Sequence, residues 1–263
     1  MATLAAIFPP TQPPERLGAV ALAAEEAGLP QLWVWEDCFS ESGIATATAI
    51  LADTSTVTVG IGLLPVPLRN VALTAMEIAT LARLFPGRLT AGIGHGVPRW
   101  MSQVGGQVES PMTLLREYTA ALYALLHGDT VTTHGRYVHL DQVALDWPPA
   151  IVPPLVVGGI RPRTIALAGE LADGLILTEE ATPDDVRTAL GHFHRDRAAD
   201  AGPADIVVFA EAAADGPAAA IAATVGEHAR AGATHLALNA TGRDANLERF
   251  VRFLAREVNP RLV

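Results

Sequence analysis

The chain contains no lysine, because all 18 of its basic residues are arginine. Schiff-base aldolases, pyridoxal-phosphate enzymes and P-loop ATPases each need a lysine, so these three classes are excluded. Cysteine is almost absent as well. The single residue, Cys38, cannot form an internal disulfide, which makes a reducing compartment acceptable.

Positive charge is scarce, since 28 acidic residues outweigh the 18 arginines and give a net charge of −10. This balance argues against a nucleic-acid partner or an anionic membrane surface. No apolar run reaches the roughly 20 residues that a membrane span needs. Residues 1–8 also lack the basic stretch of a secretory signal. We therefore expect a soluble cytoplasmic protein that acts on a small-molecule substrate.

Strand-like and helix-like patterns alternate from end to end. In the helix predicted over 70–84, Met76, Leu81 and Leu84 are expected among the core-facing positions. A doubly wound fold would show G-x-G-x-x-G after its first strand, whereas residues 8–14 read FPPTQPP. Eight strand-helix units without a break in composition predict an α/β fold, a single (β/α)8 TIM barrel domain spanning residues 1–263. The predicted strands are 3–8, 31–36, 57–63, 88–92, 155–157, 174–178, 206–210 and 234–238.

Three of these strands end in glycine-rich segments, which a barrel would bring together at one mouth. Two of them predict a phosphate cradle, because backbone N–H groups and a helix dipole favour an anion. The cradle residues are Gly94, His95 and Gly96 in GIGHG, and Gly158, Gly159, Ile160 and Arg161 in GGIR. The third segment, Gly60–Arg69, predicts either a plain strand turn or a bulge or cis peptide at Gly62–Leu63. A bulge or cis peptide would press backbone against a flat ligand.

Candidate catalytic groups also lie at predicted strand ends. Glu36 and Asp37 would serve as general acid or base, accept hydrogen bonds from a ligand, or cap the next helix. His95 is the histidine placed inside a glycine loop, where it could transfer a proton. Cys38 is expected to be inert because the neighbouring carboxylates raise a thiol pKa. No metal site is predicted.

The motifs together resemble the bacterial luciferase-like family of flavin- or deazaflavin-dependent oxidoreductases, over nearly the whole chain. Within that family the sequence is most similar to the branch that uses coenzyme F420, a deazaflavin. The residues that carry the resemblance are WVWED at 33–37, GIGLLPVPLR at 60–69, TLARLFPGRL at 80–89, GIGHG at 92–96, GRYV at 135–138, VVGG at 156–159 and ADGL at 172–175.

The resemblance implies a ring at the barrel mouth, supported on one face by a non-proline cis peptide at Gly62–Leu63. The cofactor phosphate would lie on Gly94–Gly96 and Gly158–Ile160. The family often has Asp-His where this chain has Glu36-Asp37, so His95 is a possible substitute for the usual proton-transfer histidine. The family commonly forms homodimers, and we expect one here.

The leading hypothesis is an F420-dependent oxidoreductase that moves a hydride between the deazaflavin and a small organic substrate. The first alternative is an FMN-dependent luciferase-like monooxygenase. A second is a non-catalytic barrel that binds a cofactor. A barrel enzyme acting on a sugar phosphate without redox chemistry would use the same cradle, but it leaves the Gly62 segment without a purpose.

Overall fold

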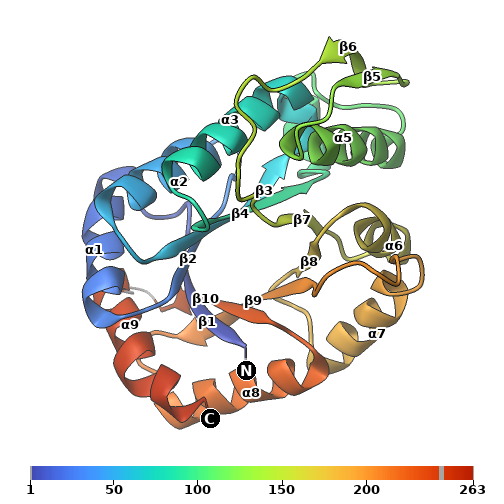
Figure 1. Ribbon diagram of the computed structural model, residues 1–263. Helices are drawn as coiled ribbons and strands as arrows, with labels where there is room; N and C mark the ends of the chain where they lie inside the picture. The colour runs from blue at the N-terminus through green and yellow to red at the C-terminus, as the bar shows by residue number, and fades with distance from the viewer. Residues whose placement is uncertain (1, 243–245, 263) are drawn as a thin grey trace.

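The computed structural model describes residues 2–242 and 246–262. Eight parallel strands form a closed barrel in the order β1-β10-β9-β8-β7-β4-β3-β2, which confirms the predicted (β/α)8 fold (Figure 1). Each lies within two residues of its predicted start, but β2 ends at Val34 rather than at residue 36. The barrel strands are β1 Thr3–Phe8, β2 Gln31–Val34, β3 Thr58–Pro65, β4 Leu89–Gly94, β7 Leu155–Gly158, β8 Gly174–Leu177, β9 Asp205–Ala213 and β10 His235–Thr241.

The strands are buried on both faces, as expected for parallel strands covered by helices. Inward-facing side chains from six strands form their own cluster inside the barrel: Ala5, Ile7, Trp33, Val156, Ile176, Val207, Phe209 and Ala237. Trp33 is the bulkiest of them and is fully buried. A Cβ on Gly60 would lie 2.3 Å from the Trp33 ring, so the neighbouring strand must carry glycine there. The barrel interior is therefore filled below the mouth.

The outer ring consists of helices that cover the barrel strands (Figure 1). The first of them ends at Gly28, whose φ of 78° suits glycine at a helix C-terminus. The helices are α1 Leu17–Ala27, α2 Gly43–Asp53, α3 Val71–Leu84, α4 Pro98–Gln103, α5 Pro111–Leu126, α6 Pro162–Leu171, α7 Pro183–Phe193, α8 Ala218–Ala231 and α9 Leu247–Phe253. Short helical turns are η1 Pro14–Arg16, η2 Val66–Leu68, η3 Leu254–Val258 and η4 Asn259–Arg261.

Helix α3 corrects one expectation. Met76 is 58% exposed and Leu84 is 63% exposed, so neither faces the core. Leu81 is buried as expected, on a stripe that also contains Ala75 and Ile78. Positions 76 and 84 fall on the opposite side of a helix with 3.6 residues per turn, and their apolar character alone made them look like core residues.

A two-stranded hairpin, β5 Val131–His134 and β6 His139–Val143, lies outside the barrel beside α5 (Figure 1). Glu117 of α5 holds its turn, because this carboxylate accepts hydrogen bonds from the backbone N–H groups of Arg136, Tyr137 and Val138 at 2.8 to 3.0 Å. This hairpin forms a separate two-stranded sheet. It leaves the eight-strand barrel uninterrupted.

Candidate active site

A cavity of about 820 Å³ opens at the C-terminal ends of the barrel strands. Its size falls in the range of small-molecule and cofactor sites. The cavity is lined by ten of the eleven residues expected in the site: Glu36, Asp37, Gly62, Leu63, His95, Gly96, Gly158, Gly159, Ile160 and Arg161. The exception is Gly94, which is buried at the end of β4.

Strand β3 departs from regular geometry where it borders the cavity. Its register against β4 shifts between Ile61 and Leu64, and the Gly62–Leu63 peptide bond is cis, as predicted. A second non-proline cis bond, Cys38–Phe39, was not predicted. The irregular segment places Leu63 on the cavity wall.

Two glycines make room for the Leu63 side chain. A Cβ on Gly158 would lie 2.2 Å from Leu63 Cδ2, and a Cβ on Gly94 would lie 2.7 Å from the same atom. Ordinary contacts begin at 3.4 Å. Gly94 thus only makes room for Leu63, whereas Gly158 makes room for Leu63 and also lines the cavity.

The segment from Gly158 to α6 presents backbone donors. Gly159 N–H is used within the barrel, since it donates to Ile176 O at 3.2 Å. Within the described residues, the N–H groups of Ile160, Arg161 and Arg163 make no hydrogen bond to the protein. They lie at the N-terminal end of a ten-residue helix, where the dipole favours negative charge. This arrangement suits an anionic group such as a phosphate.

His95 directly follows β4, and its side chain reaches Thr164 of α6. Its Nε2 is 3.4 Å from Oγ1 of Thr164, and its Nδ1 is buried with no partner in the part of the chain that is described. Burial lowers the pKa of the imidazole, because the charged form loses hydration. The side chain is therefore a neutral group with one free ring nitrogen, which suits proton transfer near neutral pH.

Asp37 follows β2 and is half-buried at the cavity wall. Burial raises the pKa of its carboxyl group. Its carboxylate has no hydrogen-bond partner among residues 2–242 and 246–262. It is consequently available to a ligand.

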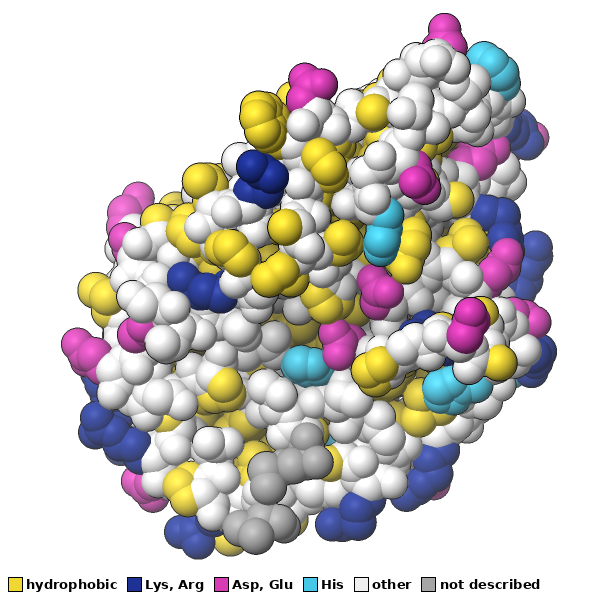
Figure 2. Space-filling view, in the orientation of Figure 1, with side chains coloured by type: hydrophobic (Ala, Val, Ile, Leu, Met, Phe, Trp, Pro, Cys, Tyr) yellow, Lys and Arg dark blue, Asp and Glu magenta, His cyan; other side chains and the backbone are white. Residues whose placement is uncertain are grey.

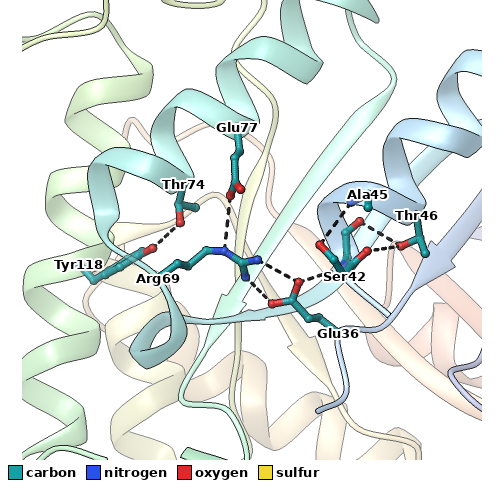
Figure 3. A network of polar contacts seen from close by, with 9 residues as sticks. Glu36, Ser42, Ala45, Thr46, Arg69, Thr74, Glu77 and Tyr118 are labelled. Carbon is teal, nitrogen blue, oxygen red and sulfur yellow. Dashed lines mark hydrogen bonds and ion pairs between the residues drawn. The ribbon is translucent and has the colours of Figure 1, made fainter. Parts of the chain in front are cut away.

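Glu36 is engaged differently, as Figure 3 shows. Its side chain forms a two-point ion pair with Arg69, in which Nη2 donates to Oε2 at 3.1 Å. Oε2 also accepts from the backbone N–H of Gly43, the first residue of α2, at 2.8 Å. Both carboxylate oxygens are thus occupied, and Glu36 is only 8% exposed. This geometry favours the helix-capping interpretation of Glu36 over an acid-base role.

The network continues beyond Arg69 into α3 and α5 (Figure 3). Arg69 Nε lies 3.5 Å from Glu77 Oε2, and burial raises the pKa of the Glu77 carboxyl group. Tyr118 bonds Thr74 through its hydroxyl at 2.6 Å, and burial raises the pKa of Tyr118 to about 12. Arg69 therefore joins the end of β2 to α3, and the bond between Thr74 and Tyr118 joins α3 to α5.

Several cavity residues carried no signal in the sequence. Phe209 of β9 contacts Trp35, with ring centroids 5.6 Å apart, and both line the cavity. Phe209 stands in an ordinary apolar strand, so only its position on the inward face identifies it. Glu179, two residues after β8, also lies on the cavity wall. Burial and the two carboxylates nearby raise the pKa of the Cys38 thiol, in line with an inert cysteine.

A family model described as "Luciferase-like monooxygenase" matches residues 2–259. The chain belongs to this family. Among its relatives, 5,10-methylenetetrahydromethanopterin reductase of Methanolobus tindarius is 28% identical over 183 residues, which cover 70% of this chain and 56% of the relative. An F420-dependent glucose-6-phosphate dehydrogenase of Kineococcus radiotolerans is 33% identical over 178 residues, covering 63% and 52%. The chain spans about half the length of these curated relatives.

Solved structures of luciferase-like type share the fold along the whole chain. An F420-dependent secondary alcohol dehydrogenase in complex with an F420-acetone adduct superposes with a TM-score of 0.88 at 19% identity, covering 100% of both chains. The F420-dependent tetrahydromethanopterin reductase of Methanopyrus kandleri gives 0.84 at 18% identity, covering 100% of this chain and 99% of its own. At these identities the likeness is one of fold alone.

Two further properties concern the described residues. No helix among them is both long and apolar enough to cross a membrane. Residues 2–242 and 246–262 contain no group of three or more histidine, cysteine, aspartate or glutamate side chains arranged to hold a metal ion.

Proposed function

We propose that the protein is an F420-dependent oxidoreductase that moves a hydride between the deazaflavin and a small organic substrate. The observation that carries the proposal is the cavity at the barrel mouth, which joins an apolar interior to unpaired backbone donors at the start of α6. A flavin-like cofactor has the same two parts, a flat ring and a phosphate. Relatives named as F420-dependent enzymes support the choice of a deazaflavin.

The chain's own residues would hold the cofactor in two places. Ile160, Arg161 and Arg163 would donate backbone N–H groups to the phosphate, while the exposed Arg161 side chain adds positive charge. Gly62 and Leu63 would lie along the ring, and Gly96 would border it. When bound, F420 supplies a ring carbon that accepts or donates a hydride.

Proton transfer falls to His95 and Asp37. In the direction of alcohol oxidation, the substrate carbon gives up a hydride, its hydroxyl loses a proton and a carbonyl forms. His95 Nδ1 accepts that proton when Nε2 carries the ring hydrogen toward Thr164. Asp37 accepts a hydrogen bond from the substrate and is the second candidate base. Glu36 acts as a positioning residue through Arg69 and Gly43.

Titration with each cofactor tests the proposal. Purified protein should bind F420, seen as a change in deazaflavin fluorescence, and reduce or oxidise it with a substrate. Tight binding of FMN with no response to F420 would overturn the proposal. That result would favour the FMN-dependent monooxygenase, which the description of the family model supports.

Variants separate an enzyme from a non-catalytic barrel. His95→Ala and Asp37→Ala should each lower turnover by about 100-fold, the scale of a lost general acid or base, while F420 affinity stays within about threefold. Unchanged turnover in both variants would contradict the catalytic assignment.

We further propose that the protein forms a homodimer. Exposed Leu73, Met76 and Leu84 lie on the outer face of α3, and hydrophobic side chains gather over α2 and α3 in Figure 2. Burying such a face is a common driving force for association. Sedimentation should give twice the mass of the 27.6 kDa chain, and Met76→Glu should yield monomers. A monomeric wild-type protein would contradict this.

A further inference from the structure

The cavity has two chemically different walls. The side formed by β3, β4 and β7 contributes three glycines, Gly62, Gly96 and Gly158, together with side chains such as Leu63 and His95. The rest of the rim runs from β8 through β9, β10 and β1 to β2, and it carries a carboxylate at each end, Glu179 after β8 and Asp37 after β2. The cofactor residues of the proposed function all lie on the first side, which leaves the carboxylate side to face a substrate.

Glu179 is held in a defined position on this second wall. The amide nitrogen of Asn239, at the end of β10, donates to Glu179 Oε1 at 3.0 Å. The other amide atom, Asn239 Oδ1, is buried without a partner in the described part of the chain. The side chain of Asn239 therefore serves one hydrogen bond, and that bond fixes the Glu179 carboxyl group.

The surroundings of Glu179 already carry an excess of negative charge. Burial raises the pKa of this carboxyl group, and the carboxylates of Glu211 and Asp37 raise it further, against the lowering effect of Asn239. An anion added next to Glu179 would have to be stripped of water and placed beside these groups, which is unfavourable. A cation or a neutral hydrogen-bond donor would offset the same charges.

Apolar side chains also line this wall. Trp35 and Phe209 stack obliquely beside the carboxylates, and Ile176 lies beneath them. Trp35 Nε1 is buried with no partner among the described residues, so a ligand oxygen could accept its hydrogen. The wall therefore fits an apolar or aromatic body that ends in a small polar group.

We propose that Glu179 is a specificity-determining residue, which makes the cavity accept substrates whose polar group is an alcohol or an amine and reject carboxylates and phosphates. The inference rests on the proposed function, because it assigns the substrate to the wall that the cofactor leaves free. A cavity that rejects phosphates would distinguish this chain from the F420-dependent glucose-6-phosphate dehydrogenase named above. Asn239 is the positioning residue for Glu179.

Binding of three matched probes tests the inference. Benzylammonium, benzyl alcohol and benzoate share one aromatic body and differ in charge. Their affinities for the F420-loaded protein are measured by calorimetry near neutral pH. Benzylammonium and benzyl alcohol should bind, and benzoate should bind at least about tenfold more weakly than benzyl alcohol. Glu179→Gln should remove most of this discrimination by raising benzoate affinity and lowering benzylammonium affinity.

Two further variants serve as controls. Glu180→Gln removes the same charge from the next residue, which is exposed and outside the cavity, and should leave the order of probes unchanged. Asn239→Ala frees the Glu179 side chain and should weaken the discrimination without abolishing it. Equal binding of benzoate and benzyl alcohol, no binding of benzylammonium, or an identical order in wild type and Glu179→Gln would each overturn the inference.

Cofactor titration keeps this inference separate from the proposed function. F420 affinity is measured first in wild type and in Glu179→Gln, and the two values should agree within about threefold. Absence of F420 binding in both proteins would refute the proposed function. Normal F420 binding without charge discrimination would refute the role of Glu179 alone.

Discussion

Replacing Gly158 with alanine should perturb the cavity through Leu63. The added Cβ would lie 2.2 Å from Leu63 Cδ2, where ordinary contacts begin at 3.4 Å. Leu63 has to move by roughly 1 Å or change rotamer in a densely packed wall. Overpacking of this kind costs about 1 to 3 kcal/mol. For a chain of this length the melting temperature should fall by roughly 2 to 10 °C.

The same change should weaken F420 binding by about tenfold, because Leu63 moves into the space of the ring. Differential scanning calorimetry gives the melting temperature, and deazaflavin fluorescence gives the affinity. Leu63→Ala removes the clashing atoms, so the double variant should be more stable than the sum of the two single changes predicts. A coupling free energy of about 1 kcal/mol or more is expected.

Gly191→Ala is the matched control for that experiment. Gly191 lies in α7 with open space around its Cα, so alanine should stabilise the helix by about 0.5 to 1 kcal/mol. If Gly158→Ala and Leu63→Ala combine additively to within about 0.5 kcal/mol, the two residues are not coupled and the steric argument is refuted.

Three other substitutions test the site and its support. Glu36→Ala should lower the free energy of unfolding by about 3 to 5 kcal/mol, because the buried Arg69 loses its two-point partner; denaturant titration measures this, and a loss below about 1 kcal/mol would contradict it. Asp37→Asn should stabilise the fold at neutral pH but not below about pH 4. Burial raises the pKa of Asp37 in the folded protein, so the protonated side chain is tolerated at low pH, and this contribution to stability is lost as the pH rises through the folded pKa. Asparagine stays neutral at every pH and avoids that loss. Melting temperatures across this range check the sign, and equal stability at neutral pH would contradict it. Glu117→Ala should increase hydrogen exchange at residues 136–138, whose N–H groups lose their acceptor; unchanged exchange there would show that Glu117 does not hold the turn.

The barrel could be predicted from the sequence because its strands are short apolar runs that alternate with helical patterns, and glycine or proline follows several of them. The glycines and prolines at the end of the third strand also located the irregular segment at Gly62–Leu63. Glycines were harder to interpret. Gly94 was expected to face a phosphate, but its missing side chain makes room for Leu63. A sequence shows that a residue must be small, but not which neighbour requires it.

The side-chain pairs of the site could not be predicted from the sequence. Glu36 stands next to Asp37, yet Arg69, which is 33 positions away from Glu36, pairs with Glu36 and not with Asp37. Glu179 and Asn239 are 60 positions apart and meet because β8 and β10 end at the same mouth. These contacts depend on barrel closure, so local patterns carry no trace of them.

The division of the cavity into a wall proposed for the cofactor and a wall proposed for the substrate bears on how this protein can be diversified. Mutation replaces side chains and leaves peptide groups in place, so substitutions at Trp35, Glu179 and Phe209 alter one wall only. A library randomised at these three positions should retain one affinity for the redox cofactor while its members differ in the compounds they accept. The substrate range could therefore change while the wall proposed to hold the cofactor stays the same.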